Sequence, residues 1–435
     1  MRRLRLITAL LSAICILSPA KAQDAGRFIG EDISRCAGQL HSYEAPARGT
    51  KYSRPPRGYK PFYVSHFSRH GSRYHTSDKF SPTLEAFARM DSLGLLTDSG
   101  RMVRHLVDSI ALIHEDKYGE LTEKGRQEHR GIAQRMMRRE RRLLRSRKRN
   151  QVLAVSSTVH RCQESMYSFC EPIRKRSRFL EFEFVSNEHT DSTLTRIEHG
   201  GRNPALSAED RGLEMVDSVK RARLVPLEAG KRFFTDPAAA KECMDGGDWH
   251  LFMYNLISHG VIEQCLDGDT PQFYSLFTFD ELLNYCAARS AACMNAHGYT
   301  LENGEVLRRV GALMVRDLLE KADEALSKGS RKAADLRFSH DGGILPLMLQ
   351  LDLEGCPGTS HVGEEWEKGW IASQQIPMAT NLQFVFYRNR KGEVIVKILH
   401  NERETFLRSL SPDRGAFYSW PRLREELEKL SVLYY

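Results

Sequence analysis

Three short apolar segments of this chain each end in a polar turn, and a helical pattern follows each turn. The segments are "PFYVSHFS" at 61–68, "VLAVSS" at 152–157 and "LRFS" at 336–339. Apolar runs of this length that are bounded by turn residues predict buried strands. Strands that alternate with helices predict an α/β sheet, and ligands of such sheets bind just beyond the carboxyl ends of the strands. Polar residues from the first and third turns can therefore meet in one site.

The rest of the pattern divides the chain into an α/β core and a helical insertion. Helices are predicted at about 81–112, from an N-cap at Thr122 onward, and across 304–329. Residues 181–186 alternate like an edge strand, and 381–401 has the pattern of a β-hairpin. We predict a large α/β core with a central mixed sheet (57–186 and 301–435), an N-terminal segment (23–56) and a smaller, mainly helical inserted domain (187–300).

Residues 1–22 have the pattern of an export signal. A basic start ("MRRLR") precedes an apolar run ("LITALLSAICILS") and a small-x-small cleavage site ("AKA"). No later apolar run is long enough for a membrane helix, so we expect a periplasmic or secreted protein without a membrane span. Removal of this segment takes away four basic residues and no acid, which lowers the formal net charge from +8 to +4. This mild excess of positive charge is compatible with anionic substrates and does not by itself imply that the protein binds nucleic acid.

Eight cysteines remain after the signal segment. An even number in an exported chain is compatible with disulfides, whereas free buried thiols are an alternative in a chain of this size. No CxxC or Cys/His spacing typical of zinc occurs, so we expect neither a metal nor another cofactor.

Arg69 and Arg73 flank His70 in the turn after the first predicted strand. Guanidinium groups repel a protonated imidazole, so they favour neutral His70, and a neutral imidazole is a nucleophile. Arginine also offers planar, permanently charged donors that suit phosphate oxygens. A lone histidine is usually a surface or hydrogen-bonded core group. Here the two arginines, with Gly71 allowing close approach of the backbone to a ligand, favour a nucleophile beside a bound anion.

His340 and Asp341 follow the third predicted strand and precede an apolar helix. Asp341 as the N-cap of that helix is the alternative interpretation, and it is compatible with a catalytic role. Arg161 follows the second strand. Alone it would be interpreted as a surface arginine, but with a site predicted at the same sheet edge it can supply a third guanidinium to that site. The remaining histidines are interpreted as ordinary polar residues, among them His66, His75, His160, His259 and His297.

Together these residues predict hydrolysis of phosphate monoesters. Catalysis of phosphoryl transfer is mostly positioning and charge stabilisation, which three arginines and a second histidine can supply. His70 would attack phosphorus in line and form a phosphohistidine. Asp341, held protonated, would give its proton to the leaving alkoxide and then take one from the incoming water.

The segments "SRHGSRY", "GELTEKGRQEHRGIAQRM", "SSTVHRCQESM" and "FSHDGGILPLM" resemble the histidine acid phosphatases, the RHG/HD branch of the histidine phosphatase superfamily. The segment "IPMATNLQFVFYRNRKGEVIVKILHNERE" is most similar to the multiple inositol polyphosphate phosphatase group, which includes bacterial phytases. The resemblance implies an α/β core with an inserted helical domain. It implies that His70 is the nucleophile and Asp341 the proton donor, and that the phosphate ligands are Arg69, Arg73, Arg161 and His340.

The sequence departs from that group at two positions. Inositol polyphosphate phosphatases typically carry a His-Ala-Glu donor segment, whereas this chain has His340-Asp341-Gly342. His75 stands where the group usually has proline after Arg-Tyr. The first difference places the donor directly after the histidine, as in other histidine acid phosphatases, and both concern the pocket rather than the reaction.

Two rival functions use the same residues. One is a phosphotransferase similar to phosphoglycerate mutase, against which the export signal counts. The other is a non-catalytic protein that binds phospho-ligands or nucleic acid on a phosphatase fold. The basic run at 138–149 is either a collar for polyanions, a nucleic-acid patch or a solvated helix end, and we favour the last. We expect a small phosphate monoester as partner and no nucleic acid; the oligomeric state is left open.

Overall fold

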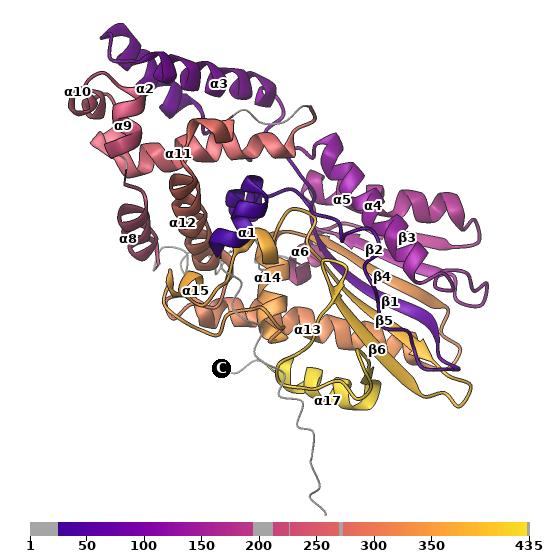
Figure 1. Ribbon diagram of the computed structural model, residues 1–435. Coiled ribbons are helices and arrows are strands. Elements are labelled where there is room, and N and C mark those ends of the chain that lie inside the picture. The colour runs from indigo at the N-terminus through magenta and orange to yellow at the C-terminus, as the bar shows by residue number, and fades with distance from the viewer. Residues whose placement is uncertain (1–24, 195–211, 226, 269–272, 433–435) are drawn as a thin grey trace, which may run out of the picture.

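The protein consists of a sheet flanked by helices, with a helical region beyond one end of the sheet (Figure 1). The computed structural model describes residues 25–194, 212–225, 227–268 and 273–432; the predicted signal segment lies outside these residues. Within them, eight strands form one sheet in the order β3-β2-β4-β1-β5-β6-β7, with β8 paired to β6. The strands are β1 (Lys60–Arg69), β2 (Gln151–Ser156), β3 (Glu181–Val185), β4 (Lys332–Ser339), β5 (Asn381–Arg388), β6 (Val394–His400), β7 (Arg403–Glu404) and β8 (Tyr418–Ser419).

Strand direction makes the sheet mixed and gives it one edge where the polar turns gather. β1 pairs in parallel with β4, and β2 pairs in parallel with β4 and β3. β5 runs antiparallel to β1 and to β6, as the predicted hairpin requires. The predicted α/β class, the three strands before the polar turns and the edge position of 181–186 are confirmed. Because β1, β2 and β4 are parallel, their carboxyl ends lie at the same edge.

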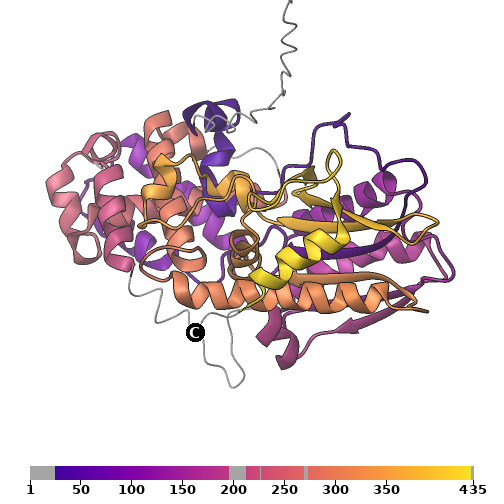
Figure 2. The same ribbon diagram turned by 90° about the horizontal axis from the view of Figure 1, so that it is seen from below.

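Helices cover both faces of the sheet, as the two views show (Figure 2). Neighbouring residues of β1 point to opposite faces, so Val64 joins one hydrophobic cluster while Tyr63 and Phe67 join the other. The first cluster includes α4 (Glu123–Arg139) and α5 (His160–Arg176). The second includes α13 (Gly304–Leu326), α14 (Asp341–Gln350) and α17 (Trp420–Leu430). Burial on both faces explains why these strands are apolar along most of their length.

The helical region has a hydrophobic cluster of its own. It combines helices from two separate stretches of chain, since α2 (Ser81–Ser92) and α3 (Asp98–His114) pack with α9 (Leu227–Phe233), α11 (Trp249–Val261) and α12 (Phe279–His297). The predicted helical stretch at about 81–112 contains two helices, which are separated near Gly94, a residue with a φ of 66°. The domain limits stay a prediction, and the packing adds α2 and α3 to the helical side.

The remaining elements are short helices around these two parts. They are α1 (Ala25–Glu31), α6 (Glu188–Leu194), α8 (Leu213–Arg223), α10 (Pro237–Glu242), α15 (Glu364–Glu367), α16 (Ala372–Gln375) and the 3-10 helices η1 (Ile33–Leu40), η2 (Asp245–Gly247), η3 (Ile262–Cys265) and η4 (Phe273–Leu276). Within the described ranges, no helix is both long and apolar enough to cross a membrane.

Two sequence features resolve in the structure. The eight cysteines between 36 and 356 are free and buried. Of the two alternatives that the sequence left open, the structure has free thiols and not disulfides. The helix that begins after Thr122 has the predicted cap, because the Thr122 hydroxyl accepts a hydrogen bond from the Gly125 amide at 3.2 Å. That helix ends at Arg139, and turns carry the chain from there to β2.

Candidate active site

The ends of β1 and β4 bring His70 and His340 together. The His70 amide donates to the Ser339 carbonyl at 2.8 Å, and the His70 carbonyl accepts from the Ala379 amide at 2.9 Å. These bonds extend the pairing of β1 with β4 and β5 by one residue and fix the turn. The two imidazole rings lie 5.5 Å apart, centre to centre, and edge to face. Residues 270 positions apart in the sequence therefore share one site.

His70 has its nucleophilic nitrogen free of the backbone. Its Nδ1 lies 2.9 Å from the Gly71 carbonyl oxygen. A carbonyl oxygen only accepts, so Nδ1 carries the hydrogen and the lone pair is on Nε2. Burial holds the pKa of His70 well below its usual value, and the charges of Arg161, Arg69 and Arg73 lower it further. The imidazole is neutral, as nucleophilic attack requires.

Gly71 is required by helix packing. A Cβ built at Gly71 would lie 2.6 Å from the Gly125 carbonyl oxygen in the first turn of α4. From the sequence, we predict that this glycine allows a ligand to approach the backbone. In the structure, the backbone of Gly125 fills the space next to Gly71. α4 thereby presses on the turn that carries His70.

Arg69 is buried and connects three segments. One terminal nitrogen donates to the carbonyls of Gln39 at 2.6 Å and Ile376 at 2.8 Å, and the other donates to Asp341 Oδ2 at 3.0 Å. Its guanidinium therefore holds the start of α14 against η1 and the turn before β5. The Nε hydrogen of Arg69 is buried and meets no acceptor in the described part of the chain.

Arg73 and Arg161 add two further guanidiniums to the same cluster. Burial lowers the pKa of Arg73 to about 9, and the charges of Arg161 and Arg69 contribute to the shift. Arg161, in the first turn of α5, donates from Nη2 to His340 Nδ1 at 3.3 Å. The buried Nε groups of Arg73 and Arg161 also lack an acceptor among the described residues. This cluster thus holds more positive charge and more donors than its own residues satisfy.

The neighbours of His340 fix its tautomer. Because a guanidinium only donates, His340 accepts at Nδ1 from Arg161, and its Nε2 carries the hydrogen toward the Ser157 hydroxyl at 3.2 Å. Burial, followed by the charge of Arg161, lowers the pKa of His340 to about 3. This residue is a neutral hydrogen-bond donor.

Asp341 is the first residue of α14, after the N-cap His340, and no side chain caps that helix. The N-cap interpretation of Asp341 is therefore wrong. Its carboxylate accepts from Arg69 at Oδ2, and His297 Nε2 lies 3.4 Å from Oδ1. Burial raises the pKa of Asp341, but the charges of His297 and Arg69 outweigh it, so the pKa lies well below its usual value. In this setting Asp341 is ionised, in contrast to the protonated acid expected from sequence.

Three residues near the site were missed by sequence reasoning. His297, interpreted there as an ordinary polar residue, ends α12 and contacts Asp341 from the helical region. The other two are Lys79 and Arg289: burial lowers the pKa of Lys79, and the nearby charges of Arg289 and Arg73 lower it further. No local motif marks these residues, because the packing of the helical region against the sheet brings them near the site.

His75, which replaces the proline usual in the resembling group, lies outside this cluster of catalytic candidates. Its buried ring packs against the rings of Phe80, His114 and His259. The distances between ring centres are 5.3 Å, 5.3 Å and 6.0 Å. No group of three or more histidine, cysteine or acidic side chains placed to hold a metal ion occurs in the ranges the structure describes.

Comparison with protein families matches residues 63–401 to the histidine phosphatase superfamily (branch 2). The comparison with curated proteins found no match. Among solved structures, the multiple inositol polyphosphate phosphatase of Bifidobacterium longum in complex with phosphate is 20% identical, with a TM-score of 0.76 over 92% of this chain and 98% of that one. Its complex with inositol hexasulfate gives 21% identity and a TM-score of 0.70 over 90% and 97%.

The phytase from D. castellii has the same fold at 14% identity, with a TM-score of 0.65 over 92% of this chain and 85% of that one. At such identities the structural likeness shows the fold alone. The family match is more informative, since it spans most of the chain and includes both turns that meet in the site. The chain belongs to branch 2 of the histidine phosphatase superfamily and is a histidine acid phosphatase.

Proposed function

We propose that the protein hydrolyses phosphate monoesters through a phosphohistidine on His70. Nε2 of His70 attacks phosphorus, the bond to the ester oxygen breaks, and that oxygen leaves with a proton from Asp341. Water then attacks the phosphohistidine, gives its proton to Asp341 and releases inorganic phosphate and neutral His70. Arg69, Arg73, Arg161 and His340 bind the phosphoryl oxygens, His340 by donating its Nε2 hydrogen to the phosphate in place of Ser157. The observation that carries this proposal is the excess positive charge around a neutral imidazole whose Nε2 makes no backbone bond.

The ionised state of Asp341 is compatible with a role as proton donor. The Asp341 pKa is low because positive charges face it. A phosphate dianion among the same arginines would offset those charges and bring a negative charge close to the carboxylate, so the Asp341 pKa would rise on binding. Substrate binding would then promote uptake of the proton that the leaving group needs, which favours weakly acidic conditions.

We infer that the substrate carries several phosphates, as inositol polyphosphates do. Lys79 and Arg289 extend the positive field beyond Arg73, where groups other than the scissile phosphate would lie. The likeness to a multiple inositol polyphosphate phosphatase and to a phytase supports the same substrate class. The export pattern at 1–22 supports action outside the cytoplasm.

A substrate panel at about pH 4 to 7, which spans the carboxylate and histidine titrations, tests the proposal. It consists of phytate, glucose 1-phosphate and p-nitrophenyl phosphate, with released inorganic phosphate as the readout. We expect release from all three, with the highest kcat/KM for phytate. His70→Ala should abolish release, whereas His160→Ala, which replaces an exposed histidine beside Arg161, should not.

Equal release by His70→Ala and the unaltered protein would refute the mechanism. Transfer of the phosphoryl group to a second sugar or acid, without free phosphate, would favour the phosphotransferase. A preference for glucose 1-phosphate over phytate would retain the reaction and reject the polyphosphate substrate.

A further inference from the structure

The basic run at 138–149 lies far from the candidate active site. Turns after α4 lead it to Gln151, where β2 begins, and it packs near Lys60 and Arg388, where β1 begins and β5 ends. The site lies at the other end of the same strands. β1 has ten residues, so the two edges are about 30 Å apart. The run therefore does not form a collar around the mouth of the site, and its charge needs another explanation.

This edge of the sheet contains a hollow of about 540 Å³ with an unbalanced lining. Among the described residues, those that line it include six cationic side chains and no carboxylate: Lys60, Arg142, Arg145, Lys148, Arg149 and Arg388. Across the described ranges, none of these six makes an ion pair with an acidic side chain. The chain has 56 acidic residues, so a shortage of carboxylates does not explain why this lining contains none.

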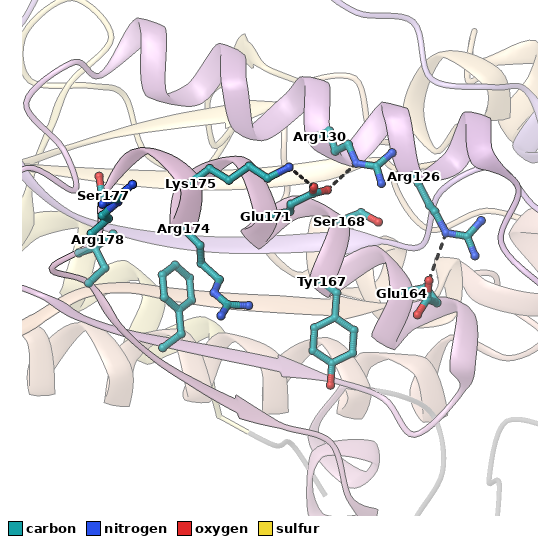
Figure 3. Close-up of a pocket in the computed structure, with 12 residues that line it drawn as sticks. Arg126, Arg130, Glu164, Tyr167, Ser168, Glu171, Arg174, Lys175, Ser177 and Arg178 are labelled. Atoms are coloured by element: carbon teal, nitrogen blue, oxygen red, sulfur yellow. Dashed lines mark hydrogen bonds and ion pairs between the residues drawn. The ribbon is translucent and has the colours of Figure 1, made fainter.

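A second basic hollow on the surface shows what a balanced lining looks like (Figure 3). It measures about 760 Å³ and lies over α4, α5 and β3. Dashed lines in Figure 3 join Arg126 to Glu164, and Arg130 and Lys175 to Glu171, at 2.5 to 3.1 Å. Carboxylates of the protein therefore neutralise most of its cations. The described part of the chain supplies no such counterions to the hollow at the start of β1.

Two of the six cations are fixed in position. The guanidiniums of Arg149 and Arg388 lie over the same ring, that of Phe62, at 4.8 and 4.3 Å from its centre. Arg149 also donates to the carbonyls of Ala325 at 2.8 Å and Lys332 at 3.0 Å. Burial lowers the pKa of both arginines, because removal from water disfavours the charged guanidinium. A bound anion would offset this unfavourable desolvation energy.

The turn that carries the other arginines is fixed as well. Leu143 and Leu144 are buried beneath it in the cluster of α4 and α5. Leu144 has a φ of 58°, a left-handed conformation that is unfavourable for leucine and persists where packing holds it. The turn is therefore a packed element with its cations presented over the hollow, and it is not a continuation of a solvated helix.

We propose that this hollow is a second binding site, separate from the catalytic one, for a compact anion that carries several phosphate or sulfate groups. The volume lies in the range of small-molecule sites. Fixed guanidiniums suit bidentate contacts to phosphate or sulfate oxygens, and the exposed Arg142, Arg145 and Lys148 can close around them. None of the large apolar side chains exposed in the described ranges belongs to 140–150 or 385–392, which argues against insertion into a membrane.

Calorimetric titration with myo-inositol hexasulfate at about pH 7 and low salt tests this site. The sulfate esters serve as a probe that the phosphatase reaction does not consume. We expect two probe molecules per chain in the unaltered protein. The triple variant Arg142→Ser, Arg145→Ser, Lys148→Ser should bind one, or bind the second roughly tenfold or more weakly, because three contacts to the anion are lost. These exposed residues make no ion pair with any residue that the structure describes, so the variant should fold and keep its activity on p-nitrophenyl phosphate.

The matched control is Arg174→Ser, Lys175→Ser, Arg178→Ser, which removes the same charge from the hollow of Figure 3. It should still bind two probe molecules. Equal loss in both variants would mean a general effect of net charge and would overturn the proposal, as would one site in the unaltered protein.

Two further measurements separate this site from its rivals. Binding at the hollow should persist in His70→Ala, so failure of the catalytic mechanism and failure of this site are distinguishable. A single-stranded oligonucleotide that binds the basic run and is not displaced by the hexasulfate would assign the run to a polymer and overturn the proposal.

Discussion

Individual side chains around Asp341 determine when this residue can donate a proton. Arg69 and His297 face its two oxygens and favour the carboxylate, while burial favours the acid. The balance between these effects is set by residues from separate parts of the chain. Sequence motifs identify Asp341 but not its pKa, since the effect of His297 depends on how α12 packs.

Replacement of Asp341 by Asn should remove the proposed proton donor. For glucose 1-phosphate, whose leaving alkoxide needs a proton, we expect kcat to fall by about 10²–10⁴-fold. p-Nitrophenolate leaves without a proton, so kcat for p-nitrophenyl phosphate should fall much less. Steady-state kinetics on the two substrates measures this difference. An equal fall for both would mean that Asp341 positions the phosphate rather than protonating the leaving group.

Replacement of His297 by Gln should change the pH dependence of the reaction. The charge of His297 lowers the Asp341 pKa, so its removal should raise that pKa. In the complex with substrate, activity requires protonated Asp341 and is lost as pH rises through this pKa. The alkaline limb of the kcat profile for glucose 1-phosphate, which reports the enzyme–substrate complex, should therefore move to higher pH. A uniform fall in kcat with an unchanged profile would indicate a purely structural role.

Elements around the site are held together by contacts that leave no room for a methyl group. β1 turns into the His70 segment directly beneath the first turn of α4, where Gly71 faces the Gly125 carbonyl. The start of α14 has a similar contact, since a Cβ at Gly343 would lie 2.4 Å from the Leu194 carbonyl oxygen at the end of α6. Both glycines occur in the motifs that identified the site, and helix packing explains them.

Replacement of Gly71 by Ala should force α4 away from the end of β1. We expect the free energy of unfolding to fall by about 1–3 kcal/mol, the usual range for an overpacked site, and kcat to fall because His70 is displaced. Urea unfolding and kinetics on p-nitrophenyl phosphate measure the two effects. Gly358→Ala is the control, because a Cβ there meets nothing within 4 Å. If Gly71→Ala matched the control in both measurements, the contact with Gly125 would not constrain the site.

At the scale of the whole molecule, the sequence predicted what depends on strand pattern and missed what depends on packing between distant elements. The strands at 61–68 and 336–339 were predictable because an apolar run ends at a polar turn, and parallel pairing then brings His70 to His340. The approach of α12 to Asp341 has no local signal. Likewise, periodicity could not place the basic run at the edge of the sheet opposite the site. That position depends on the run leading directly into the first residue of β2.

Neutral histidines buried across the molecule should make its stability fall in acid. Burial lowers the pKa of His129 to about 3, while an unfolded chain would titrate this group near its ordinary value of about 6.5. Between these values the unfolded state binds a proton that the folded state does not, so the free energy of unfolding declines as pH falls. The slope is about 1.4 kcal/mol per pH unit for each such histidine.

His129→Gln should therefore flatten this decline by about 1.4 kcal/mol per pH unit, whatever its effect on stability at neutral pH. Urea unfolding at several values between about pH 4 and 7 measures the slope. His361→Gln is a control of opposite sign, since Glu302 raises the pKa of the exposed His361 and so stabilises the folded state in acid; its loss should steepen the decline slightly. If His129→Gln left the slope unchanged, His129 would have to become protonated in the folded protein, although neither of its buried ring nitrogens has a hydrogen-bond partner among the described residues.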